Sequence, residues 1–88
     1  MKIKNDFKIV NVGDDYILVP LGAEMDKFNG TVILNDVSAF LIDKLKSDRT
    51  EEELIELMLE EYETDRTTAQ ADINAAIERM KEMGIMDE

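Results

Sequence analysis

The chain has 88 residues, of which 44% are hydrophobic and 35% are charged, so one domain with a modest core is expected. It contains no Cys and no His, which excludes disulfides, thiolate nucleophiles, imidazole bases and Cys/His zinc sites. The formal net charge of −11 opposes binding to nucleic-acid phosphates and to anionic membrane surfaces.

No segment of the sequence has the character of a membrane span or of a targeting signal. A span needs about 18 consecutive apolar residues, and no such run occurs. The N-terminal segment MKIKNDFKIV has lysines but lacks the apolar stretch of a signal peptide. A cytoplasmic protein, folded as a single domain over residues 1–88, is the expectation.

The first third of the chain is typical of β-strands. Residues 7–12 (FKIVNV) and 16–19 (YILV) are apolar and β-branched, and the intervening GDD has the composition of a tight turn, which predicts a hairpin. Residues 20–30 are rich in Gly, Asp and Asn and predict a loop, in which Met25 and Phe28 could pack on the domain. A third strand is expected at Thr31–Leu34.

From Asn35 onward the apolar spacing becomes helical. Asn35 is a good N-cap, and apolar residues follow it on one face at Val37, Phe40, Leu41 and Leu45. A second helix is predicted after Thr50, which forms a capping-box pattern with Glu53.

A third helix is predicted after Thr67, which has the same capping-box relation to Gln70. Its apolar face comprises Ala69, Ile73, Ala76, Ile77, Met80 and Met83. Gly84 is placed to end this helix, and IMDE is expected to be a short tail. Met58 and Met80 are expected in the core, whereas Met83 and Met86 could belong to the core or to a binding surface.

Three strands followed by three helices predict an α+β fold, in which a three-stranded antiparallel sheet precedes the helices in a winged-helix-like arrangement. The short connection at Asn35 would hold the third strand rigidly against the helical half.

The acidic run from Glu51 to Asp65 falls mostly off the apolar face. A metal or substrate cluster is one interpretation, but the run lacks the spacing of a calcium-binding loop. A solvated helix face, with acids favoured at the helix N-terminus, is the preferred interpretation. No bound metal, cofactor or catalytic residue is expected.

Two other functional classes remain open. Ser38, near a helix start in an acidic chain, could carry a phosphopantetheine arm, although carrier proteins are all-helical. A mass increase on Ser38 after phosphopantetheinyl transfer would support that class. A winged-helix regulator could place the third helix in DNA. That helix, however, carries only two basic residues of interest, Arg79 and Lys81, against the acidic residues Asp72, Glu78 and Glu82. Salt-dependent retention on heparin would support the regulator.

Several residues, in order along the chain, resemble the pattern of the PqqD-like family, named after coenzyme pyrroloquinoline quinone (PQQ) synthesis protein D. The matching positions are Leu34 with Asn35, Phe40 with Leu41, Thr50, Leu54, Tyr62, Asp72 with Ile73, and Gly84 with Ile85. The resemblance covers about residues 15–86. The chain departs from the family at the first inter-helix turn, where SDR replaces an acid–glycine pair.

The resemblance implies a non-catalytic adaptor, a leader-peptide recognition element of ribosomal peptide modification. Its partners would be the leader of a precursor peptide and a modifying enzyme, often a radical S-adenosylmethionine (SAM) enzyme. The leader would add a strand to the edge of the third strand and place side chains against the third helix. An unpaired strand edge is a physical template for such pairing.

The peptide-binding residues expected on this basis come from the third strand and the third helix. Within the helix, Ile73 is expected mainly in the core, whereas Ala69, Ala76 and Met83 are expected on the flank of the groove, beside Asp72 and Arg79. The strand residues are Thr31, Val32, Ile33 and Leu34.

Overall fold

A computed structural model describes residues 1–22 and 32–87. The strands are β1 (Phe7–Val12), β2 (Asp15–Pro20) and β3 (Val32–Leu34), and the helices are α1 (Asp36–Lys44), α2 (Glu51–Glu61) and α3 (Arg66–Met83). The predicted α+β order of an antiparallel sheet followed by three helices is confirmed, and the arrangement is compatible with a winged-helix-like description. Thr31 and most of the predicted loop, including Met25 and Phe28, lie outside the described residues.

The β1–β2 hairpin closes through a two-residue turn. Val12 pairs with Asp15, so Gly13 and Asp14 are the central residues. Gly13 has a φ of 64°, and no non-glycine residue in the described part of the chain has a positive φ. A positive φ at the first central position alone matches a type II′ turn, where glycine is favoured.

The strand order is β1-β2-β3, so β2 is central and β3 lies at one edge of the sheet. β3 is antiparallel to β2, with Leu18 opposite Val32 and Tyr16 opposite Leu34. Buried Leu34 and half-buried Val32 face the core, whereas the side chain of Ile33 is 57% exposed on the outer face.

The junction between β3 and α1 consists of Asn35 alone. Its backbone is extended (φ −79°, ψ 171°), and its side chain accepts a hydrogen bond of 2.8 Å from the Ser38 backbone N–H. Asn35 therefore ends the strand and caps the helix, as predicted.

The caps of α2 and α3 differ in how well the sequence predicted them. Thr50 and Glu53 form the predicted capping box. The predicted box of Thr67 and Gln70 is wrong, because Asp65 is the N-cap of α3 and accepts from the Thr68 backbone N–H at 2.7 Å. α3 ends at Gly84, which has a φ of 75°, as predicted.

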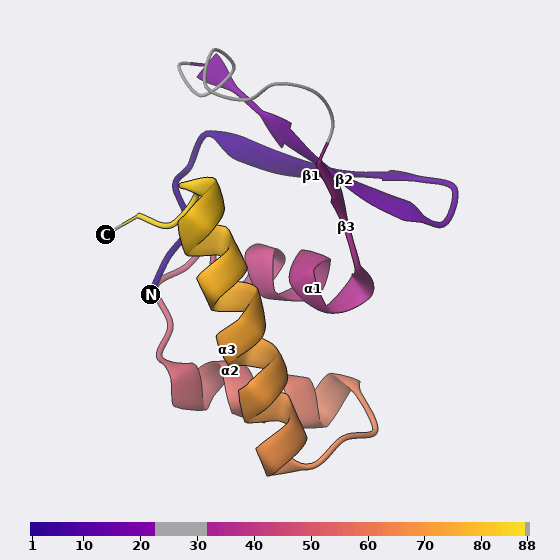
Figure 1. Ribbon diagram of the computed structural model, residues 1–88, viewed down its shortest axis with the longest axis vertical. Coiled ribbons are helices and arrows are strands. Elements are labelled where there is room, and N and C mark those ends of the chain that lie inside the picture. The colour runs from indigo at the N-terminus through magenta and orange to yellow at the C-terminus, as the bar shows by residue number, and fades with distance from the viewer. Residues whose placement is uncertain (23–31, 88) are drawn as a thin grey trace.

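The C-terminal residues after Gly84 are a structural element rather than a free tail. Ile85 and Met86 are buried, and Met86 forms a β-bridge with Ile3. Backbone hydrogen bonds join Lys4 N–H to the Ile85 carbonyl (2.9 Å) and Ile3 N–H to the Leu45 carbonyl (3.0 Å). The two chain ends therefore lie close together (Figure 1) and close one side of the core.

The helices lie to one side of the hairpin, and α3 crosses α1 and α2 (Figure 1). The residues with the least exposure come from all three helices and from both chain ends; they include Ile3, Leu41, Leu54, Ile73 and Ile85. Across residues 1–22 and 32–87, no helix combines the length and hydrophobicity that a membrane span requires.

Candidate functional site

The first component of the candidate site is the free edge of β3. Residues flanking a two-residue hairpin turn form a hydrogen-bonded pair, and such pairs alternate along an antiparallel ladder. In β2, Asp15, Ile17 and Val19 therefore direct their backbone groups toward β1. The alternation continues beyond β2, where the Leu21 N–H donates to the Asp6 carbonyl at 2.7 Å.

The same alternation orients the backbone of β3. Tyr16 and Leu18 direct their backbone groups toward β3, so their partners Leu34 and Val32 bond to β2. The N–H and C=O of Ile33 then point away from β2. In the described part of the chain β3 pairs with no other strand, so Ile33 offers a donor and an acceptor at an open edge.

The second component is a cavity of about 260 Å³ between the start of α1 and α3. Asn35, Val37 and Ser38 line it from the strand–helix junction and the first turn of α1. The α3 side is lined by Asp72, Ala75, Ala76 and Arg79. Two adjacent alanines leave the space unfilled, and Ala76, 8% exposed, forms part of its wall.

Two opposite charges flank the alanines. Asp72 and Arg79 are both exposed and both line the cavity. They are seven residues apart, about 10 Å along the helix axis, and so lie on one face of α3. A segment bound here would meet a negative group near one end of the cavity and a positive group near the other.

The predicted site residues of α3 are divided between the cavity and the core. Asp72, Ala76 and Arg79 line the same cavity, and their role in peptide binding stays a prediction. Ala69 is corrected from groove flank to core, because its exposure is 0%. Ile73, also 0% exposed, is in the core as expected, and half-buried Met83 packs against the core at the end of α3 without lining the cavity.

Sequence reasoning missed four residues that line the cavity. Asn35 was assigned to capping, Val37 to the apolar face and Ser38 to the carrier-protein alternative. The direct β3–α1 junction nevertheless places the first turn of α1 beside the strand edge. Ala75 follows Asp72 by three residues and precedes Arg79 by four, so the 3.6-residue period would have placed it between them.

The environment of Ser38 bears on the carrier-protein alternative. Ser38 is 8% exposed and is held in the first turn of α1 by the Asn35 cap. A phosphopantetheine arm requires a hydroxyl that a transferase can reach, so this position disfavours that alternative. In the part of the chain that the structure describes, no group of three or more acidic side chains is arranged to hold a metal ion.

Comparison with known proteins identifies relatives at the level of family and of fold. The family of coenzyme PQQ synthesis protein D (PqqD) matches residues 16–86. No curated protein matches the chain significantly.

Two solved structures share the fold. One is TbiB1 in complex with the TbiA(beta) leader peptide, with a TM-score of 0.74, 20% identity, and coverage of 99% of this chain and 95% of that chain. The other is lasso peptide synthetase B1 complexed with the leader peptide, with a TM-score of 0.70, 23% identity, and coverage of 96% and 93%.

Proposed function

Because the chain belongs to the PqqD family, we propose that it is a non-catalytic adaptor that binds the leader of a ribosomally made precursor peptide. The observation that carries the proposal is the open edge of β3 beside the cavity on α3. The two structures that share this fold are both complexes with leader peptides, which supports the same ligand class here.

The binding mode is strand addition. An extended leader pairs with the backbone of Ile33 and takes its affinity from main-chain hydrogen bonds. An apolar side chain of the leader enters the cavity at Ala75 and Ala76, and Asp72 and Arg79 contact polar groups on either side. Main-chain pairing tolerates many sequences, so selectivity resides in the cavity and the two charges.

The adaptor presents the bound leader to a modifying enzyme, and we propose a radical SAM enzyme as that partner. Binding takes place in the cytoplasm, where translation supplies the precursor. In this proposal the adaptor catalyses no step of the modification. It acts by binding alone, through the backbone of β3 and the lining of the cavity. The enzyme would be encoded near this chain together with a short precursor peptide.

Amide hydrogen exchange tests the proposal at one residue. The Ile33 N–H points to the open edge, whereas those of Val32 and Leu34 already bond to β2. A saturating synthetic leader, taken from the precursor encoded beside the gene, should slow the exchange of Ile33 at least tenfold. A scrambled leader is the control. Binding of the leader without protection of Ile33 would rule out docking on this edge.

A further inference from the structure

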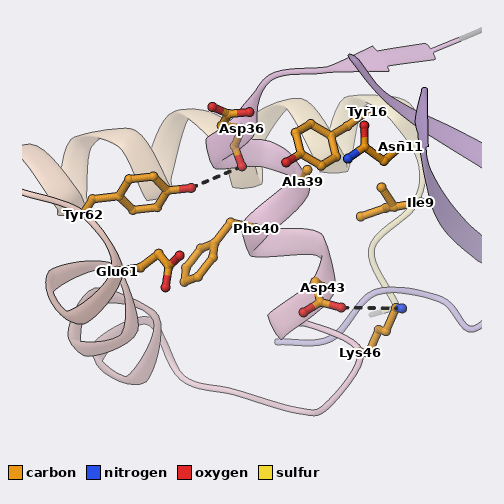
Figure 2. A pocket seen from close by; sticks show the side chains of 10 residues that line it. All are labelled: Ile9, Asn11, Tyr16, Asp36, Ala39, Phe40, Asp43, Lys46, Glu61 and Tyr62. Atoms are coloured by element: carbon orange, nitrogen blue, oxygen red, sulfur yellow. Dashed lines mark hydrogen bonds and ion pairs between the residues drawn. The ribbon is translucent and has the colours of Figure 1, made fainter. Parts of the chain in front are cut away.

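A second cavity, of about 520 Å³, lies between the sheet, α1 and the end of α2. Figure 2 shows residues of β1 and β2 on one side of α1 and Phe40, Glu61 and Tyr62 on the other. No residue that lines this cavity also lines the cavity on α3. It is therefore separate from the cavity proposed for the leader.

The walls of this cavity are unusually aromatic for this chain, which has three Phe and two Tyr. Phe7 is in the core, and Phe28 lies outside the described residues. The remaining three, Tyr16, Phe40 and Tyr62, are half-buried and line the cavity.

The contact between two of these rings accounts for only part of their surface. Phe40 and Tyr62 pack edge to face, with centroids 5.4 Å apart and an interplanar angle of 80°. This contact fastens α1 to α2, and both rings still line the open cavity. Lys44 Nζ lies 5.3 Å from the centroid of the Phe40 ring, so this ring already accepts a cation on one side.

The charge lining the cavity is negative. The lining contains three carboxylates, those of Asp36, Asp43 and Glu61, and one ammonium group, that of Lys46. The ammonium group pairs with Asp43 at 3.6 Å. Burial raises the pKa of Tyr62, and the negative charges of Asp36 and Glu61 raise it further. The phenol therefore stays protonated at neutral pH, and its environment favours a cation.

We infer that this cavity binds an arginine side chain presented by a protein partner. A guanidinium group is planar and always charged, stacks on aromatic rings and bonds to carboxylates through two N–H groups. Lysine offers a point charge without the plane, so it uses less of this lining. The net charge of −11 favours approach of a basic protein surface. This inference does not depend on leader binding, because the two cavities share no residue.

A titration with N-acetyl-arginine N-methylamide, followed by amide chemical shifts, tests the inference. Saturable shifts with a millimolar dissociation constant are expected at Tyr16, Ala39, Phe40 and Tyr62. The citrulline analogue has nearly the same shape without the charge, and its shifts at equal concentration should be at least fivefold smaller. Shifts scattered over the acidic surface, or equal shifts from the two probes, would overturn the inference.

Two double variants separate this site from general charge attraction. Asp36→Asn with Glu61→Gln removes two charges from the lining and should weaken arginine binding at least threefold. Glu60→Gln with Glu78→Gln removes two exposed charges elsewhere and should leave binding nearly unchanged. An equal loss in both variants would assign the attraction to net charge and refute the site. The dispersion of the amide chemical shifts verifies that each variant is folded. The comparison of arginine with citrulline on the unmodified protein tests the site without relying on either variant.

Discussion

Proline at Ile33 separates peptide docking from folding. Proline removes the backbone N–H and fixes φ, and it is tolerated in edge strands when the lost N–H faces away from the sheet. The Ile33 N–H points to the open edge, and the Ile33 side chain is 57% exposed, so Ile33→Pro removes neither a sheet hydrogen bond nor a core contact. Val32, which precedes it, is already extended, as a residue before proline prefers to be.

The expected cost appears in binding. One lost hydrogen bond to the leader is worth about 0.5–1.5 kcal/mol net, which corresponds to about two- to tenfold in affinity. Val32→Pro is the matched opposite, because the Val32 N–H bonds to β2 and its loss should lower the free energy of unfolding. Ile33→Val keeps the N–H and should change neither affinity nor stability by more than about 0.5 kcal/mol.

Calorimetric titration with the synthetic leader and urea unfolding of the same samples provide the two measurements. Ile33→Pro should weaken binding while keeping a near-normal urea midpoint, and Val32→Pro should lower the midpoint. The reasoning fails if Ile33→Pro folds normally and binds the leader as tightly as the unmodified protein does. It also fails if both proline variants unfold, since β3 would then be paired on both edges.

Three further predictions concern the cavity, a helix cap and a helix end. Ala76→Leu should weaken leader binding by about 1 kcal/mol, or roughly fivefold, at a nearly unchanged melting temperature. Ala69→Leu, in the core, should instead cost about 1–3 kcal/mol of stability. The opposite pattern would place the groove elsewhere. The hydrogen bond from the Thr68 backbone N–H lowers the pKa of Asp65 from its ordinary value of 3.8, so in acid the unfolded chain binds more protons than the folded one. The resulting stabilisation is complete above the unfolded pKa of 3.8 and is lost as the pH falls through the lower folded pKa. Asp65→Asn keeps a capping side chain but no titrating group, so its urea midpoints at about pH 5 and pH 3 should differ less than those of the unmodified protein. An unchanged difference would contradict this. Gly84→Ala forces a β-carbon into a backbone with a φ of 75° and should lower the free energy of unfolding by about 1–2 kcal/mol in urea titrations, while no loss would show that the helix end relaxes.

Local chemistry explains which parts of the fold the sequence predicted well. Gly13 is followed by an acidic residue between two β-branched runs, and Asn35 and Thr50 each precede a helical apolar pattern. Each signal depends only on a few neighbouring residues, which is why the hairpin and two N-caps were predicted correctly. The start of α3 was ambiguous because Asp65, Thr67 and Thr68 are all capable N-caps. Arg66 bonds to Glu52 and Glu56 of α2, at 2.7 and 2.6 Å, and such a tertiary contact is not readable from spacing.

The remaining differences also arise from contacts distant in sequence. Ile85 and Met86 follow a helix-ending glycine and are therefore expected in a tail, but Ile3 and Lys4 pair with them and bury them. Ala69 shares the apolar face of α3 with Ala76, and only the position of α1 and α2 decides that Ala69 is enclosed while Ala76 borders a cavity. A helical wheel shows on which face of the helix a residue lies, but not which other element packs against that face.

The direct connection of β3 to α1 explains how one short helix can serve two cavities. Asn35 fixes the direction of α1 relative to the strand edge, and the Phe40–Tyr62 contact fixes α1 to α2. Val37 and Ser38 then face the proposed leader cavity, while Asp36 and Phe40 line the cavity proposed for arginine. Because α1 is capped at its N-terminus and its middle packs against Tyr62, neither ligand has to order this wall, and the entropic cost of forming it is part of folding. The two sites therefore share a rigid element without sharing a residue, which is the geometry needed to hold a peptide and a protein partner at once.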